Sequence, residues 1–362
     1  MSTFSAKDNI MSEYTQKKGL YEHLSASILQ ITEGLMKKDG IKYASAVYRI
    51  KDADSLSEKI RRKGEKYKTL SDITDIGGVR IITYYADDVD RVAELIEREF
   101  KVDKENSIDK RKTLEPNVFG YLSLHYVICL DDRRAVLPEY ENLGKLKIEV
   151  QIRSILQHSW AEMEHDMGYK SNIEVPSEIV RDFSRLAGLL EMADKEFQEI
   201  RQKISKYELE VSEKIQSDEQ GEEVRLDAVS LQILLDTDKG YISLNQEIMD
   251  CTGIEIDSVA ENIQSALNKC RWLGIKTVGD VKLLLEHKKD LAVGLAKKIL
   301  DDNVDSIFYN SIGMFYLCYA ELVTEYSKQR WQDYLRENHI GREEECTQIV
   351  EKLSKVYQEI SE

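Results

Sequence analysis

Apolar residues in the first part of the chain follow two different periods. Over residues 8–40 they recur every three or four positions, which predicts one or two helices ending near Gly40. Runs of strand-forming residues and helical stretches then alternate. We predict strands at 42–51, 79–84, 121–130 and 146–154, helices at 54–67 and 87–99, and a loop at 101–118. Strands that alternate with helices indicate a mixed sheet with helices packed on it.

Beyond residue 154 the pattern is helical almost to the end. We predict a helix over 154–170 and a long helix from Pro176 to about residue 216, because proline costs little in a first helical turn. The polar stretch that follows predicts a linker, and the remainder reads as a bundle of about six helices. The predicted organisation is therefore an α+β domain over 1–216, a linker over 217–225 and an all-α domain over 226–362.

Charge is distributed unevenly along the 362 residues. The formal net charge is −16, from 51 Lys and Arg against 67 Asp and Glu, and almost all of the acidic surplus falls after about residue 172. An acidic C-terminal half argues against nucleic-acid binding there. The N-terminal half is close to neutral but locally basic.

Targeting signals and cysteine motifs are missing from the sequence. No apolar run approaches the roughly 20 residues that cross a bilayer, and residues 1–14 contain no apolar signal-peptide core. The five cysteines are scattered without metal-ligand spacing, which is typical of reduced, mostly buried thiols. We expect a cytoplasmic protein that does not contact membranes.

Three predicted strands each place functional side chains on one face, because successive side chains of a strand point to opposite sides. These rows are Arg49 with Lys51, Tyr121 with His125, and Glu149 with Gln151 and Arg153. For a single strand, a solvated face is the ordinary interpretation. Three such rows in one sheet favour a binding or catalytic face.

Four segments extend these rows into recognisable motifs. In chain order they are Tyr48-Arg49-Ile50-Lys51, Asp75-Ile76-Gly77-Gly78-Val79-Arg80, Gly120-Tyr121-Leu122-Ser123-Leu124-His125 and Glu149-Val150-Gln151-Ile152-Arg153. Together they resemble the synthetase domain of the RelA/SpoT alarmone synthetases over about residues 20–200. The resemblance implies a nucleotidyltransferase-like fold. It also implies transfer of the β,γ-pyrophosphate of ATP to the 3′-hydroxyl of GDP or GTP, which yields AMP and the (p)ppGpp of the stringent response.

The resemblance also implies a role for each matched residue. Asp75 and Glu149 would be the catalytic carboxylates and Mg²⁺ ligands, and Glu149 is also a candidate for activating the attacking hydroxyl. The ATP-binding residues would be Arg49, Lys51, Lys59 and Arg80. The acceptor-binding residues would be Tyr121, which stacks on guanine, with His125, Gln151, Arg153 and His158.

The acceptor loop departs from the family pattern. Asn117 stands where the family usually has a lysine for acceptor phosphate, and Phe119 stands where it has an asparagine. Two alternatives therefore stay open: a toxin-like enzyme that pyrophosphorylates the 3′ end of tRNA, and an inactive nucleotide sensor. The presence of both Asp75 and Glu149 counts against the sensor, because a binding protein has little need of two metal ligands.

Two further features stay open. The helical spacing of His158, Glu162 and His165 is compatible with a metal site, although the family helix explains these residues without one. For the C-terminal domain, regulation, a homo-oligomer or an antitoxin-like protein partner are all compatible with the sequence.

Overall fold

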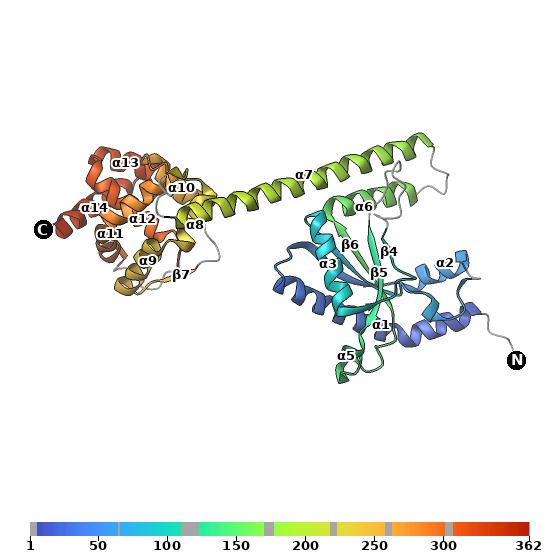
Figure 1. The fold of residues 1–362 in the computed structure, drawn as a ribbon. Coiled ribbons are helices and arrows are strands. Elements are labelled where there is room, and N and C mark those ends of the chain that lie inside the picture. The colour runs from blue at the N-terminus through green and yellow to red at the C-terminus, as the bar shows by residue number, and fades with distance from the viewer. Residues whose placement is uncertain are drawn as a thin grey trace. The chain divides into compact units, whose positions relative to one another are not determined.

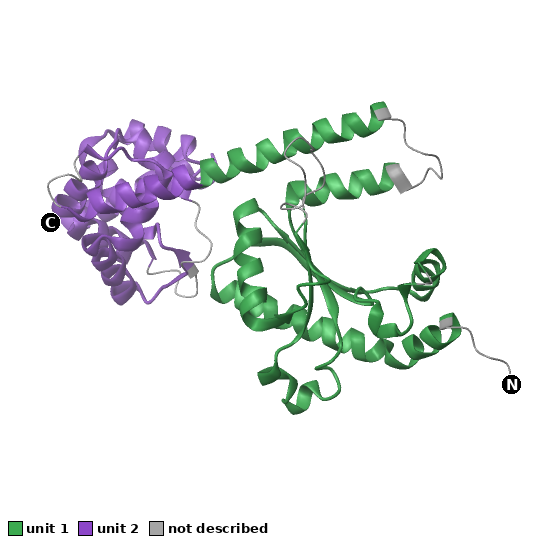
Figure 2. Ribbon diagram, turned by 45° about the vertical axis from the view of Figure 1, so that its right-hand side comes forward, with its two compact units in different colours: residues 1–201 green, residues 202–362 purple. Residues whose placement is uncertain are grey.

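The computed structural model describes two compact units, Met1–Arg201 and Gln202–Glu362 (Figure 2). The described residues are 6–63, 66–109, 123–169, 177–217, 223–257, 263–300 and 307–361. The two units divide within one long helix, α7 (Ser177–Gln216). The domain boundaries predicted from sequence, 1–216 and 226–362, stay a prediction.

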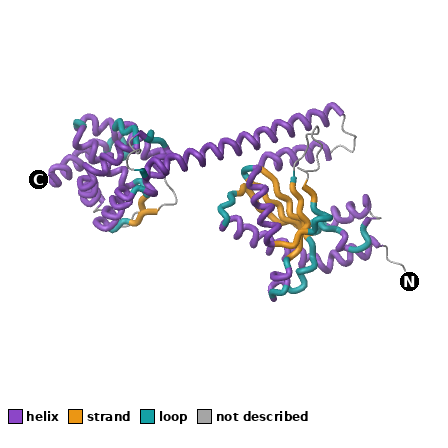
Figure 3. Tube along the Cα trace, viewed as in Figure 1, coloured by secondary structure: helices purple, strands orange, loops and turns teal. Residues whose placement is uncertain are grey.

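The first unit is built on a six-stranded mixed sheet (Figure 3). Its strands are β1 (Tyr43–Ile50), β2 (Gly77–Thr83), β3 (Phe100–Val102), β4 (Ile108–Asp109), β5 (Leu124–Leu130) and β6 (Ile148–Ser154). The order is β1-β2-β6-β5-β3, with β4 also paired to β5. β2 and β6 run parallel and the other pairs run antiparallel, so the predicted mixed sheet is confirmed.

Helices cover one face of this sheet. α1 (Ala6–Lys38) packs on β1 and β2, and α3 (Ala86–Glu99) packs on β6 (Figure 1). The strand residues under them are apolar and almost completely buried: Val79, Ile81, Leu124, Val150 and Ile152. The opposite face carries the polar alternate residues, as the period of two predicted.

Close packing of α1 requires a glycine at the start of β2. A Cβ atom on Gly77 would lie 2.4 Å from Ser25 Oγ and 3.0 Å from Ile148 Cγ2. Real Cβ atoms do not approach other atoms so closely, so α1 lies directly on the backbone of β2. Of the two glycines before Val79, Gly77 is therefore required by the packing of α1 on β2.

The predicted loop at 101–118 is only partly a loop. β3 and β4 begin within or next to this range and pair with β5, while residues 110–118 lie outside the described residues. Both strands are too short to show a period of two, and their partner on β5 fixes their conformation. Shorter helices complete the unit: α2 (Ala53–Lys63), α5 (Asp132–Ala135), and the 3₁₀ turns Leu70–Asp72 and Pro138–Tyr140.

Two helices follow the last strand, α6 (Ile155–Tyr169) and the first part of α7. Trp160 Nε1 donates to the carbonyl oxygen of Phe183 at 3.2 Å, which joins α6 to α7. Ser154 Oγ at the end of β6 donates to the buried carboxyl of Asp194 at 2.7 Å. These contacts attach α7 to the sheet within the first unit.

The regular structure of the described part of the second unit is helical apart from one small sheet. Its helices after α7 are α8 (Ala228–Thr237), α9 (Lys239–Thr252), α10 (Ile263–Trp272), α11 (Val278–Leu300), α12 (Ile312–Glu325), α13 (Lys328–Glu337) and α14 (Cys346–Ser361). β7 (Glu255–Asp257) and β8 (Ile307–Tyr309) form a parallel pair that the all-helical prediction does not include. Each is three residues long, too short for a period to be visible in the sequence.

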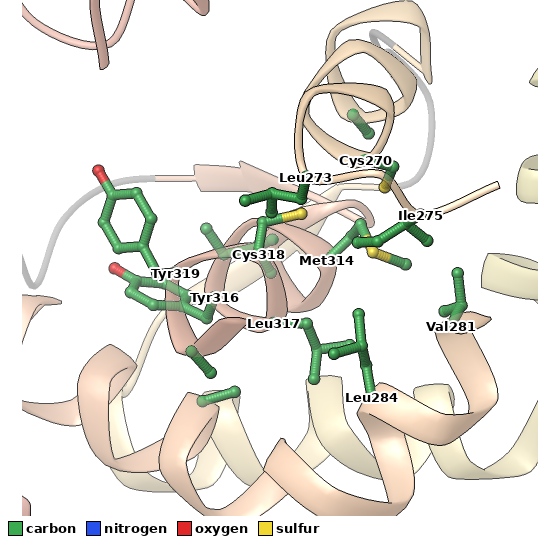
Figure 4. Packing of buried hydrophobic residues seen from close by; sticks show 14 of the residues in the cluster. Cys270, Leu273, Ile275, Val281, Leu284, Met314, Tyr316, Leu317, Cys318 and Tyr319 are labelled. Atoms are coloured by element: carbon green, nitrogen blue, oxygen red, sulfur yellow. The ribbon is translucent and has the colours of Figure 1, made fainter. Parts of the chain in front are cut away.

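The core of the second unit gathers around α12. Figure 4 shows Leu317, Cys318 and Met314 of this helix between Cys270 of α10 and Leu284 of α11. All five cysteines are free thiols, three of them buried, as predicted. Within the described part of the chain, no helix combines the length and apolarity needed to cross a membrane.

Candidate active site

Strand register brings the predicted site residues into two rows on the polar face of the sheet. Arg49, Gly78 and Glu149 lie side by side on β1, β2 and β6. One step along, Arg80, Gln151 and His125 lie side by side on β2, β6 and β5. Gly78 keeps this face open, because a Cβ atom there would lie 3.2 Å from the carbonyl oxygen of Glu149 and 3.8 Å from Arg49 Cγ.

The first carboxylate, Asp75, lies in the turn that enters β2 and is held by two lysines. Its Oδ2 atom lies 2.7 Å from Lys59 Nζ and 3.1 Å from Lys51 Nζ. Burial raises the pKa of Asp75, but the hydrogen bond and charge of Lys59 and the charge of Lys51 outweigh burial and bring this pKa below its ordinary value. The carboxylate is therefore ionised at neutral pH.

The other oxygen of Asp75 is available. Oδ1 is buried and makes no hydrogen bond within the part of the chain that the structure describes. A buried carboxylate oxygen without a partner is unusual, because burial without a hydrogen bond costs free energy. It is a natural position for a ligand.

The second carboxylate, Glu149, is hydrogen-bonded at both oxygens. His125 Nδ1 lies 2.8 Å from Oε1, and Gln151 Nε2 donates to Oε2 at 2.7 Å. Burial raises the pKa of Glu149, but His125 and Gln151 outweigh burial, so this pKa also lies below its ordinary value. The charge of Asp75 opposes this lowering, which places the two carboxylates within electrostatic reach of each other.

Arginines gather around the second row. Burial, followed by the charges of Arg80 and Arg49, lowers the pKa of Arg153 to about 10, against the opposing charge of Glu162. Arg153 Nη2 donates to Gln151 Oε1 at 3.2 Å, which extends the hydrogen-bonded chain from His125 through Glu149 and Gln151 to the guanidinium. Such a cluster of cations suits a polyanionic ligand.

Helix α6 adds a carboxylate that the sequence did not assign to the site. Arg80 Nη1 donates to Glu162 Oε1 at 3.1 Å, and His158 Nδ1 lies 3.6 Å from the same oxygen. Burial lowers the pKa of His158, and the charges of Arg80 and Arg153 act in the same direction against Glu162. The i, i+4 spacing of His158 and Glu162 was the only available signal, and it does not reveal the partner on β2.

A second residue missed from the sequence is Tyr14 on α1. Its hydroxyl donates to the carbonyl oxygen of Lys51 at 2.6 Å, and the amide of Lys51 donates to Ile76 O at 2.8 Å. These bonds fix the chain at Lys51 and so direct its side chain toward Asp75. Nothing in the polar helix pattern around Tyr14 signals this contact.

Most of the predicted site is therefore brought together, with one exception. Tyr121 and the loop with Asn117 and Phe119 lie outside the described residues. Within the described ranges, no group of three His, Cys, Asp or Glu side chains could hold a metal unaided, and this includes the α6 face with His158, Glu162 and His165.

The donor set nevertheless fits Mg²⁺. The site offers two ionised carboxylates, one of which has a buried oxygen without a hydrogen-bond partner among the described residues. Magnesium in nucleotide sites usually takes only one or two protein carboxylates and completes its shell with water and phosphate oxygens.

Comparisons with known proteins find relatives of the first part of the chain. Residues 48–174 match the family described as "Region found in RelA / SpoT proteins". The chain is 30% identical to GTP pyrophosphokinase YjbM of Bacillus subtilis over 175 residues, which is 48% of this chain and 78% of that protein. It is also 30% identical to GTP pyrophosphokinase YwaC of the same organism over 159 residues, which is 43% of this chain and 72% of that protein.

Among solved structures, the small alarmone synthetase 1 of Bacillus subtilis is similar. The TM-score is 0.45 and the identity 22%, over 54% of this chain and 99% of the other.

Proposed function

Because the chain belongs to the RelA/SpoT family, we propose that it transfers the β,γ-pyrophosphate of ATP to the 3′-hydroxyl of GDP or GTP. Family membership makes it a pyrophosphotransferase. The proposal adds the donor, the acceptor and the residues that serve each. The tRNA and inactive-sensor alternatives find no support, since both curated relatives are GTP pyrophosphokinases by name.

One observation carries the proposal: two ionised carboxylates lie within electrostatic reach of each other, beside lysines and arginines on one sheet face. Transfer of phosphoryl groups depends on charge neutralisation and in-line positioning more than on covalent help from the protein. The lysines and arginines of this face can neutralise phosphate charge, and its carboxylates can hold the metal that positions the phosphates.

On the donor side, the lysines and arginines would hold ATP. Lys51 and Lys59 lie beside Asp75 with their ammonium groups directed at the site, where they can exchange a carboxylate oxygen for phosphate oxygens. Arg49 and Arg80 are in adjacent rows and carry planar guanidinium groups, which can stack on adenine as lysine cannot.

Asp75 and Glu149 would hold Mg²⁺, which when bound neutralises charge on the phosphate oxygens. Asp75 would contribute Oδ1, which has no hydrogen-bond partner among the described residues. His125 and Gln151 would keep Glu149 oriented.

On the acceptor side, His125, Gln151, Arg153 and His158 would position the guanosine nucleotide, together with Tyr121. The 3′-hydroxyl oxygen attacks the β-phosphorus of ATP, the bond from that phosphorus to the α–β bridging oxygen breaks, and AMP leaves. The hydroxyl proton passes to the ionised Glu149. The buried chain from Glu149 to Arg153 would hold this carboxylate in place.

The direct test is a labelling experiment. Purified protein is incubated with γ-labelled ATP, Mg²⁺, and GDP, GTP or deacylated tRNA in separate reactions. We expect label in a guanosine polyphosphate and AMP as the second product. Label in tRNA, or no transfer to any acceptor, would overturn the proposal.

Asp75→Asn tests the carboxylate. The variant keeps the size of the side chain but removes its charge, and we expect transfer to fall by at least about a hundredfold, as when other single groups that stabilise transition-state charge are removed. Asp54→Asn is the matched control, since Asp54 is an exposed carboxylate in the first turn of α2. Full activity of Asp75→Asn in a protein with wild-type circular dichroism would remove Asp75 from the mechanism.

For the second unit, the sequence leaves regulation, oligomer formation and an antitoxin-like partner open. The family match at residues 48–174 does not extend to it.

A further inference from the structure

A cavity of about 390 Å³ lies within the second unit. It is formed between α10, β8 and the beginning of α12, and its lining includes Ser265, Lys269, Phe308, Ser311, Phe315 and Tyr316. A lining of aromatic and other apolar side chains with a few polar groups is typical of sites for small organic ligands, and the volume is in their range.

Lys269 is the unusual residue of this cavity. The residue is 9% exposed, and its Nζ donates to Ser265 Oγ at 2.6 Å and to Ser265 O at 3.3 Å. The ammonium also lies 6.0 Å from the centre of the Phe315 ring. No carboxylate of the described residues forms an ion pair with it, although a buried ammonium without a counter-ion costs free energy.

Lys288, in the same unit, is a lysine that forms structural ion pairs, and it contrasts with Lys269. Lys288 Nζ lies 2.6 Å from Glu321 and 2.9 Å from Glu325, and these carboxylates raise the pKa of Lys288 despite partial burial. Burial lowers the pKa of Lys269, against a smaller opposing effect of the thiols of Cys318 and Cys270. Among the described residues, Lys269 therefore has no carboxylate partner of the kind that pairs with Lys288.

We propose that this cavity binds a small aromatic carboxylate whose carboxylate group pairs with Lys269. The ring of the ligand packs against Phe308, Phe315 and Tyr316, where Phe315 and Tyr316 already form an edge-to-face pair with centroids 5.3 Å apart. The hydroxyls of Ser265 and Ser311 provide further polar contacts at the cavity wall, and that of Ser311 does not cap α12.

Lys269 is the only cation among the described residues that line the cavity, and this favours a carboxylate ligand over a phosphate. A phosphate monoester carries a charge between −1.5 and −2 at neutral pH, as a rough value. One lysine would leave part of that charge uncompensated in an aromatic cavity, whereas a carboxylate is neutralised by one lysine.

Binding is measured on the full-length protein by isothermal titration calorimetry with phenylacetate, phenylacetamide and phenyl phosphate. We expect phenylacetate to bind, and both other compounds to bind at least about tenfold more weakly, because a hydrogen bond to a charged group is lost or a charge stays unpaired. Lys269→Met should weaken phenylacetate binding by at least about tenfold. Lys298→Met is the matched control, since Lys298 pairs with Glu359 on the surface, and it should bind as the wild type does.

A second variant addresses the cavity instead of the charge. Ala266→Leu adds bulk at a residue of the cavity wall and should also abolish phenylacetate binding, with helix content checked by circular dichroism. The proposal is overturned if phenylacetate does not bind the wild type, if Lys269→Met binds it equally well, or if phenyl phosphate binds more tightly. Because the readout is binding in the second unit, none of these results depends on pyrophosphate transfer.

Discussion

Individual neighbouring residues explain how Asp75 and Glu149 stay ionised although both are partly buried. Two ammonium groups, from Lys51 and Lys59, compensate Asp75, whereas Glu149 relies on His125 and on an amide of Gln151. The two carboxylates are thus stabilised by different kinds of partner. Removing the lysines that pair with Asp75 should therefore leave Glu149 ionised, and removing the partners of Glu149 should leave Asp75 ionised.

Asp75 makes a testable contribution to stability. Because its pKa is lower in the folded than in the unfolded chain, its ion pairs stabilise the fold above the ordinary carboxyl pKa of about 4, and this contribution is lost as the pH falls through the folded pKa. We expect Asp75→Asn to lower the free energy of unfolding by about 1–3 kcal/mol at pH 7. Urea unfolding from pH 7 to pH 3 should show this difference shrinking; a constant difference would exclude the ion pairs as its cause.

At the scale of secondary-structure elements, the contact of α1 with β2 depends on Gly77. We expect Gly77→Ala to destabilise the first unit by about 1–3 kcal/mol, because its Cβ would overlap Ser25 Oγ and Ile148. Gly34→Ala is the matched control within α1: its Cβ has open space and should stabilise the helix by about 0.5–1 kcal/mol. Denaturant midpoints of both variants check this, and an unchanged midpoint for Gly77→Ala would contradict the contact.

The contact of α7 with β6 depends on Asp194. Burial raises the pKa of Asp194, with Ser154 opposing, so the ionised form is disfavoured in the folded state and the penalty applies above the ordinary carboxyl pKa. Asp194→Asn keeps an oxygen for Ser154 and should raise stability at pH 7.5 by about 1 kcal/mol, with the gain vanishing as the pH approaches 4. Glu196→Gln, at an exposed position of α7, should change nothing. A less stable Asp194→Asn at pH 7.5 would show that the charge is needed.

At the scale of the whole molecule, period and motif predicted most of the first unit. The strands with clear alternation were located, and the face with Arg49, Glu149 and Gln151 was identified because a period of two determines the face of each residue. The sequence could not predict β3 and β4, whose conformation depends on β5. Nor could it predict the contact of Glu162 with Arg80, which joins a helix to a distant strand.

The second unit was predictable as helical but not as a site. Lys269 lies in an ordinary helical pattern, and its burial beside Phe315 arises only when α10 and α12 pack. The same holds for Tyr14, a helical residue whose role depends on a turn after β1. Contacts of this kind depend on tertiary structure, which local periodicity does not encode.

The parallel pairing of β2 with β6 has a consequence for how the chain acquires its site during synthesis. Arg80 and its partner Glu162 are separated by 82 residues, so their contact has high contact order and closes a long loop. The antiparallel β1–β2 pair, joined through α2, can assemble early, but β6 and α6 emerge much later. A nascent chain therefore exposes its lysines and Asp75 well before Glu149 arrives, and the catalytic face is completed only once this long-range pairing has formed.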